Sequence, residues 1–263
     1  MHTEIKRLKL RKLSNTRDLS DLPSNVKIAR GKLIRSAKLY KLPRSTVKKL
    51  KAYNIQTIID LRTEQEAAEK PDTIFAHYVN LSLLNAGAFG ITFEKNIKQS
   101  LKAHADEILK QFGTPDQYMS KIYDHMLFDE VSQEKLTAAL RIIICANGGV
   151  IWHCTGGKDR AGILAMLVES LLGVDEETIL LDYAATGIFQ RRRNRMFKLF
   201  SVFIPLPRKT KKMLMEFMKT NPIHLKAALD KIKTRYGSVT DYCKAALGIT
   251  EEEILTLQAK YLE

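Results

Sequence analysis

The chain has 263 residues, of which 45% are hydrophobic and 27% charged, and its formal net charge is +14. This composition excludes a disordered chain, and the length favours one domain over residues 1–263 that buries a large core. No stretch reaches the roughly 18–20 apolar residues of a membrane span, and residues 1–13 lack the apolar core of a signal peptide, which predicts a cytoplasmic protein and leaves export by other signals open.

Strand and helix patterns alternate in the first part of the chain. We expect a strand pair over 26–39 around Gly31, a helix over 43–53, a strand over 55–61, a short helix over 63–69 and an edge strand over 77–81. A loop of small residues follows at 85–90.

Helix patterns dominate the second part. Helices are expected over 94–112, 115–127, 132–146, 175–185, 222–236, 238–247 and 250–261. One strand, Gly149 to His153, interrupts them, and an apolar stripe from Ile163 to Leu172 predicts a helix directly after it. This order predicts an α/β sandwich with a central, mostly parallel sheet flanked by helices and a helix-rich C-terminal half.

The most informative stretch lies between that strand and that helix. It reads His-Cys-Thr-Gly-Gly-Lys-Asp-Arg-Ala-Gly over residues 153–162. A glycine-containing turn at a helix N-terminus directs backbone N–H groups toward an anion. Cys154 is therefore expected to ionise readily to a nucleophilic thiolate, and Arg160 can hold two phosphate oxygens with its planar fork.

These residues resemble a known family. Cys-x5-Arg is the signature of the cysteine-dependent protein tyrosine phosphatases, and the form His-Cys-x-x-Gly-Lys-Asp-Arg-x-Gly is similar to a microbial branch with tyrosine, dual-specificity and phosphoinositide phosphatases. Three further segments resemble motifs of the same family: Asn15-Thr16-Arg17-Asp18-Leu19, Gly31-Lys32-Leu33-Ile34-Arg35-Ser36-Ala37, and Ile58-Ile59-Asp60-Leu61-Arg62 followed by Glu64 and Glu66.

The resemblance implies a three-layer phosphatase fold and hydrolysis of phosphomonoesters through a phosphocysteine. Phosphotyrosine is the expected substrate group, with phosphoserine, phosphothreonine and phosphoinositides as further candidates. The expected phosphate-binding residues share the loop: Thr155, Gly156, Gly157, Lys158, Asp159 and Arg160.

Two aspartates are candidates for the general acid that protonates the leaving oxygen. Asp159 lies inside the loop and is the first choice, because the order Lys-Asp-Arg distinguishes this branch. Asp60 ends a neighbouring strand, but it can equally form a buried pair with Arg62 that braces the loop.

Four residues are expected to support the loop rather than to react. By resemblance, His153 holds it from behind as a hydrogen-bonded core histidine. Asn15, Arg17 and Asp18 are expected to be architectural, with an Arg–Asp pair that ties the N-terminal segment to the underside of the site.

Ala161 departs from the family pattern, in which a Thr or Ser follows the arginine. The missing hydroxyl is expected to slow hydrolysis of the phosphocysteine about ten- to a hundred-fold. A binding module that recognises phosphate in a phosphoprotein or an anionic lipid without turning it over is therefore the alternative function. A sulfurtransferase also uses a cysteine in such a loop, but its chemistry does not require Lys-Asp-Arg.

The remaining patterns argue against other chemistries. The six histidines show no metal-ligand spacing, no nucleotide-binding glycine motif is present, and no nucleic-acid-binding signature accompanies the charge, so we expect neither metal, cofactor nor nucleic acid. Three cysteines do not form a disulfide framework. Cys145 is expected to be a buried, inert thiol, and the alternative is a resolving partner for oxidised Cys154. The oligomeric state stays open.

Residues 191–235 carry 14 Lys or Arg against two acidic residues, interleaved with Phe, Met and Leu. Within this region, residues 187–222 are expected to form a lid-like insertion that Pro205 and Pro207 divide into two short helices. Such a segment can lie on an anionic membrane or collect phosphorylated substrates. The alternative is a helix with no binding role, whose basic face is solvated and whose apolar face packs against the protein.

Overall fold

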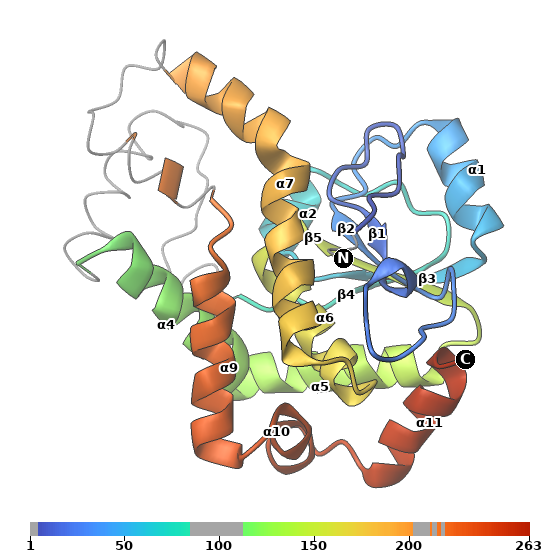
Figure 1. Cartoon of the computed structure of the whole chain (residues 1–263). Coiled ribbons are helices and arrows are strands. Elements are labelled where there is room, and N and C mark those ends of the chain that lie inside the picture. The colour runs from blue at the N-terminus through green and yellow to red at the C-terminus, as the bar shows by residue number, and fades with distance from the viewer. Residues whose placement is uncertain (1–4, 85–112, 202–210, 212–214, 217–218) are drawn as a thin grey trace.

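The computed structural model describes residues 5–84, 113–201, 211, 215–216 and 219–263. These residues form a five-stranded sheet in the order β1-β2-β5-β3-β4 (Figure 1). Its strands are β1 (Arg17–Asp18), β2 (Leu33–Ala37), β3 (Ile55–Asp60), β4 (His77–Asn80) and β5 (Gly149–Cys154). Only β1 and β2 pair antiparallel, so the expected mostly parallel sheet is confirmed.

Helices surround this sheet. They are α1 (Arg44–Ala52), α2 (Glu64–Glu69), α4 (Pro115–Phe128), α5 (Glu130–Cys145), α6 (Asp159–Leu171), α7 (Glu176–Ser201), α9 (Pro222–Tyr236), α10 (Val239–Ala245) and α11 (Glu251–Tyr261), with a short 3-10 turn at Leu19–Asp21. Capping boxes at Thr63, Thr114 and Thr250 begin α2, α4 and α11. The loop and helix expected over 85–90 and 94–112 lie outside the described residues.

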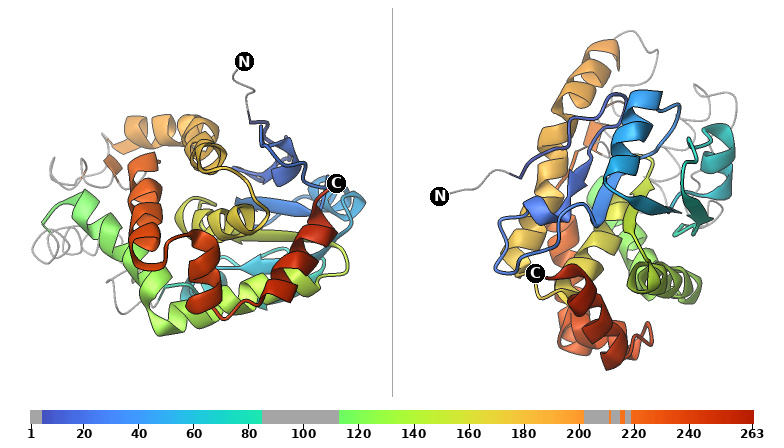
Figure 2. Two further views of the ribbon diagram at one scale, coloured as in Figure 1. Left: turned by 60° about the horizontal axis from the view of Figure 1, so that its bottom comes forward. Right: turned by 90° about the vertical axis from the view of Figure 1, so that its right-hand side faces the viewer.

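Alternate residues along the central strands enter two separate cores, which makes the fold three-layered. Ile151 of β5 packs with α1 residues such as Leu50 in one core. Val150 and Trp152, its neighbours on the same strand, enter the other core with α5, α6 and the C-terminal helices. Figure 2 shows this arrangement from two further sides.

Two expectations about the elements are wrong. The strand pair expected around Gly31 does not form, because the antiparallel partner of β2 is β1. In the segment before Gly31, Ile28 makes an isolated bridge with Leu262. Helix α7 does not end at residue 185 but continues to Ser201. At Gly187 an added Cβ would lie 3.5 Å from Thr220 Cβ, an ordinary contact distance, so the segment before α9 passes close to the helix at this point.

The topology brings the motif segments to one edge of the sheet. Ala37 pairs with Cys154, and Asp60 pairs with His153, at the carboxyl ends of three parallel strands. Ligands bind at this edge in open α/β sheets, because the loops that leave the strands converge there. No helix in the described part of the chain is both long and apolar enough to cross a membrane.

Candidate active site

The loop from Cys154 to Arg160 links β5 directly to α6. Cys154 ends the strand with 3% of its surface exposed, and α6 begins at Asp159. Gly157 has a φ of 66°, and a Cβ at this position would lie 2.4 Å from the Ser36 carbonyl oxygen. Only glycine fits there, so this residue fixes the curvature of the loop against β2.

Side chains beneath the loop hold its carbonyl groups. The Asn15 amide donates to the carbonyl oxygens of Gly156 and Gly157, at 3.0 and 2.8 Å. Arg35 donates to the carbonyls of Gly157 and Lys158, at 3.1 and 3.2 Å. Three consecutive carbonyls are therefore directed toward the underside of the loop.

Gln190 of α7 adds a third support, because its amide donates to the Gly156 carbonyl at 2.7 Å. In a planar trans peptide, the N–H of the following residue points opposite to the carbonyl. The N–H groups of Gly157, Lys158 and Asp159 consequently point away from the underside. Together with the N-terminal end of α6, they suit the binding of an oxyanion.

Arg160 is held by a carboxylate from α2. Its Nη1 and Nη2 atoms lie 2.5 and 2.9 Å from the two oxygens of Glu66, which also accepts a hydrogen bond from Thr155. Burial alone would raise the pKa of Glu66, but the hydrogen bonds and charge of Arg160 lower it to about 2. Burial alone would lower the pKa of Arg160, but Glu66 and the nearby Cys154 charge raise it. The guanidinium is thus fixed beside the sulfur.

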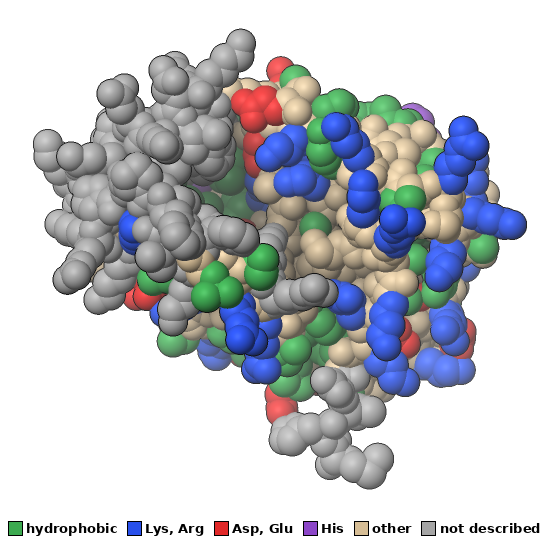
Figure 3. Space-filling model, turned by 90° about the horizontal axis from the view of Figure 1, so that it is seen from above, with side chains coloured by type: hydrophobic (Ala, Val, Ile, Leu, Met, Phe, Trp, Pro, Cys, Tyr) green, Lys and Arg blue, Asp and Glu red, His purple; other side chains and the backbone are tan. Residues whose placement is uncertain are grey.

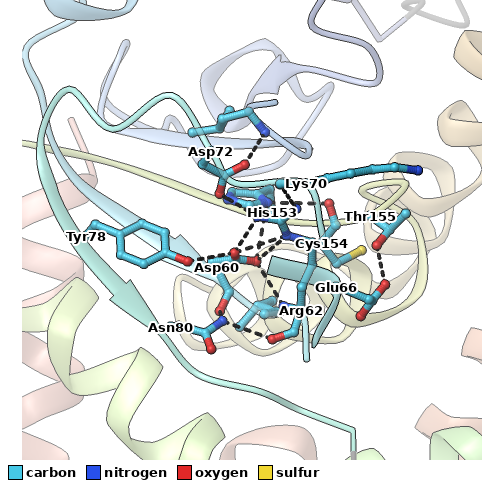
Figure 4. Close-up of polar contacts among 12 residues, drawn as sticks. Asp60, Arg62, Glu66, Lys70, Asp72, Tyr78, Asn80, His153, Cys154 and Thr155 are labelled. Carbon is cyan, nitrogen blue, oxygen red and sulfur yellow. Dashed lines mark hydrogen bonds and ion pairs between the residues drawn. The ribbon is translucent and has the colours of Figure 1, made fainter. Parts of the chain in front are cut away.

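Asp60 belongs to a buried network rather than to an open position (Figure 4). Its two oxygens accept hydrogen bonds from Arg62, with 2.7 Å between Oδ2 and Nη2, and Tyr78 donates to Oδ2 at 2.9 Å. Burial would raise the pKa of Asp60, but the hydrogen bonds from Arg62 and the charges of His153 and Arg62 lower it. This geometry matches the bracing pair that was the alternative to an acid.

His153 is fully buried behind the loop, with its Nε2 atom 2.9 Å from Asp72 Oδ2. Asp60, Asp72 and His153 bring three potential metal ligands within 4.8 Å of one another. However, the Arg62 Nη2 atom lies 2.9 Å from Asp72 Oδ2 and also contacts Asp60. A guanidinium therefore already supplies positive charge to this carboxylate pair.

Arg17 pairs with Asp182 of α7, and not with Asp18. Arg17 and Arg35 both contact the Asp182 carboxylate, and all three side chains are buried. Asp18, next in the strand, points to the opposite face, where its Oδ2 accepts the Gly31 N–H at 2.6 Å. Arg17 also donates to Asn15 Oδ1 at 2.6 Å, so the arginine connects α7 to the side chain that holds the loop.

Asp159 and Lys158 face the helices rather than Glu66. The Asp159 Oδ1 atom accepts hydrogen bonds from Tyr123 at 2.8 Å and from Tyr183 at 3.2 Å. Lys158 was expected to be one of the phosphate-binding residues. Its Nζ atom donates to the Lys219 carbonyl at 3.0 Å and lies 3.4 Å from Asp159 Oδ2. The lysine thus joins the loop to the segment that enters α9.

Cys145 is exposed, so the expectation of a buried thiol is wrong. It ends α5, whereas Cys154 stands at the far end of β5. The intervening six-residue strand spans about 20 Å, which is too far for a disulfide between the two. Cys145 therefore does not act as a resolving partner for Cys154 in this fold.

Sequence reasoning missed several side chains around the loop. Those not predicted are Glu66 as the partner of Arg160, Arg35 and Gln190 as holders of carbonyls, Asp182 as the partner of Arg17, and Tyr123 and Tyr183 as partners of Asp159. Arg35 and Glu66 belong to the motif segments quoted above. No motif in the sequence points to the other four residues, which are Tyr123, Asp182, Tyr183 and Gln190.

Comparison with known proteins identifies the family of this chain. Residues 8–263 match a family model described as the tyrosine phosphatase family. A protein of Cupriavidus necator grouped by name with the tyrosine-protein phosphatases is 24% identical over 258 residues, which cover 95% of this chain and 86% of that protein.

Two further relatives match over shorter stretches. A tyrosine-protein phosphatase of Nostoc commune is 29% identical over 158 residues, which cover 59% of this chain and 48% of that protein. The triple specificity protein phosphatase PtpB of Mycobacterium tuberculosis is 25% identical over 184 residues, which cover 64% of this chain and 65% of that protein.

Proposed function

The chain belongs to the tyrosine phosphatase family, and we propose that it hydrolyses phosphomonoesters through a phosphocysteine formed on Cys154. The observation that carries this proposal is the loop itself. Its carbonyls are held on the underside, so its N–H groups point to the opposite side, where they can surround a phosphoryl group above the sulfur. Arg160, oriented by Glu66, supplies the matching positive charge.

The proposed reaction has two steps. The Cys154 thiolate attacks phosphorus, the bond from phosphorus to the leaving oxygen breaks, and that oxygen takes a proton from an acid. Water then attacks the phosphocysteine, the sulfur–phosphorus bond breaks, and the water proton returns to the same carboxylate. Inorganic phosphate is released, and the thiolate is restored.

We assign the acid to Asp159. Its Oδ2 atom lies beside Lys158 on the catalytic loop, whereas Asp60 is fully buried, with both oxygens engaged by Arg62. A carboxylate stabilised in this way by a guanidinium holds no proton to donate at neutral pH. Asp60 and Arg62 instead brace the edge of the sheet from which the loop leaves.

Asp159→Asn is expected to lower kcat/KM for a phosphotyrosine peptide by about 10²-fold, because the phenolate then leaves unprotonated. The loss should be small for p-nitrophenyl phosphate, whose leaving group needs no proton. Asp60→Asn should lower the melting temperature and reduce both rates by similar factors. Steady-state kinetics on the two substrates measure this, and an equal loss on both substrates with Asp159→Asn would contradict the assignment.

For substrates, we propose phosphotyrosine first, with phosphoserine, phosphothreonine and phosphoinositides as further groups. The name of the Nostoc commune relative, a tyrosine-protein phosphatase, supports phosphotyrosine, and the name of the Mycobacterium tuberculosis relative, a triple specificity protein phosphatase, supports more than one kind of substrate group. We also propose a cytoplasmic location, since the catalytic thiol requires reducing conditions and the described cysteines are free.

The basic surface beside the loop supports contact with an anionic membrane. On α7, Arg191 and Arg195 are exposed together with Met196 and Leu199. Figure 3 shows many Lys and Arg side chains on one face of the molecule. Exposed basic residues also occur at Lys6, Arg7, Lys9, Arg11, Lys12, Lys41, Arg44, Lys48, Lys49 and Lys51. No acidic residue lies between Asp21 and Asp60, so this part of the chain carries a second basic stretch in addition to the one predicted over 191–235.

A phosphate-release panel tests the proposed function. Phosphotyrosine, phosphoserine and phosphothreonine peptides, and phosphoinositides in vesicles, are expected to release phosphate, with phosphotyrosine fastest. Acid quenching followed by mass spectrometry should detect phosphate on Cys154, because Ala161 offers no hydroxyl to the departing sulfur. Ala161→Thr should raise turnover about ten-fold and lower the trapped fraction. Binding without release or trapping would favour the alternative, a phosphate-recognising module.

A further inference from the structure

Two tyrosines from different helices meet the Asp159 carboxyl group. The hydroxyl groups of Tyr123, on α4, and Tyr183, on α7, lie 2.6 Å apart, and both lie within hydrogen-bond distance of the same oxygen, Asp159 Oδ1. Three segments that are distant in sequence therefore converge on one carboxylate oxygen at the N-terminus of α6.

Both tyrosines are neutral donors. Burial raises the pKa of each phenol well above its usual value, and the charge of Asp159 raises it further. Each hydroxyl has one proton, so one hydroxyl donates to Asp159 Oδ1 while the other donates either to the same oxygen or to its neighbouring hydroxyl. In either arrangement Oδ1 acts as an acceptor, and a proton carried by Asp159 resides on Oδ2.

Packing fixes the two rings. Each tyrosine is about 1% exposed, and the Tyr123 ring lies 6.2 Å from the ring of His224 on α9. A Cβ added at Gly162 would meet the Tyr183 ring at 3.0 Å, which explains why the last position of the loop motif is glycine. The phenol oxygens consequently have little freedom to follow a moving carboxyl group; they determine its position instead.

We propose that Tyr123 and Tyr183 are positioning residues that hold Asp159 with its Oδ2 atom directed toward the leaving oxygen. This inference rests on the proposed role of Asp159 as the acid. In the first step Oδ2 delivers its proton, and the two phenols then stabilise the carboxylate that remains. In the second step the same oxygen is already oriented to accept the proton of the attacking water, so neither step requires the side chain to rotate.

The test is a set of aryl phosphates whose leaving groups range from p-nitrophenolate to unsubstituted phenolate. Tyr123→Phe and Tyr183→Phe should each lower kcat/KM about ten-fold for phenyl phosphate while leaving p-nitrophenyl phosphate within about two-fold. The double variant should approach the leaving-group dependence of Asp159→Asn. KM should change little, since the tyrosines do not contact the expected phosphate position.

Tyr261→Phe is the matched control. Tyr261 lies in α11, away from the loop, and is also buried. Its hydroxyl donates to the Ile143 carbonyl at 2.8 Å. It should lower the melting temperature by a similar amount and leave the leaving-group dependence unchanged. The three single variants thereby separate the loss of a buried hydrogen bond from the loss of an oriented acid.

One outcome would contradict the positioning role of the tyrosines alone, and another would contradict the assignment of Asp159 as the acid. If Asp159→Asn is sensitive to the leaving group but both tyrosine variants slow all substrates equally, the positioning role is wrong and the proposed acid stands. If Asp159→Asn itself slows all substrates equally, the acid assignment fails, and the positioning role fails with it. Melting temperatures recorded for every variant identify any that lose activity through unfolding.

Discussion

Cys154→Ser is expected to abolish phosphate release, with turnover falling by about 10⁴-fold or more. The substitution replaces sulfur with oxygen in a side chain that is 3% exposed, so the fold should persist. A serine hydroxyl stays protonated at neutral pH, so the side chain no longer offers an anionic nucleophile. The backbone N–H groups and Arg160 remain in place, so inorganic phosphate should still bind.

Calorimetric titration with inorganic phosphate, together with the release assay, measures the two effects separately. Cys243→Ser is the control, because Cys243 is also buried but lies in α10, where burial raises the pKa of its thiol to about 12. This variant should keep its turnover. Residual release above about 1% of wild type by Cys154→Ser would show that the reaction does not pass through this sulfur.

The sequence was sufficient to predict the strand, the loop and the helix around Cys154, because those signals are local. A short apolar strand, a glycine-containing turn and an apolar stripe each depend on residues within a few positions of one another. The structure places β5 and α6 accordingly, and α6 begins inside the motif at Asp159. The parallel sheet followed from the alternation of strands and helices in the same way.

The supports of the loop could not be predicted, because they depend on long-range packing. Asn15 contacts residues more than 140 positions away, and Arg17 finds its partner at Asp182 rather than at the adjacent Asp18. The sequence shows an Arg-Asp dipeptide, but side chains of neighbouring strand residues point to opposite faces. Only the docking of α7 against β1 and β2 determines which carboxylate the arginine meets.

The same limit applies to the acid. Asp60 and Asp159 are equivalent as residue types, and the motif Lys-Asp-Arg made Asp159 the first choice without excluding Asp60. What separates them is their neighbours: Arg62 and Tyr78 around one, and two protonated phenols around the other. Neighbours of this kind are set by tertiary structure, so the sequence left two candidates where the geometry favours one.

Asp182→Asn is expected to destabilise the protein by about 3–5 kcal/mol, since it removes the carboxylate that two buried guanidinium groups share. Glu169 lies nearby, and burial together with the charge of Asp182 raises the pKa of Glu169 in the wild type. The melting temperature should fall by roughly 10 °C, and Arg35 should lose its hold on the loop carbonyls. Thermal unfolding monitored by circular dichroism, with phosphate release at a temperature where the variant is folded, measures both effects.

Asp230→Asn provides the matched comparison, because it makes the same substitution in an exposed pair with Lys226 on α9. It should change stability by less than about 0.5 kcal/mol, since solvent screens that pair. If Asp182→Asn melts within about 2 °C of wild type, the buried arginines do not depend on this carboxylate. If it melts early but retains full activity when folded, the Arg17–Asp182–Arg35 cluster anchors α7 to the sheet without shaping the loop above it.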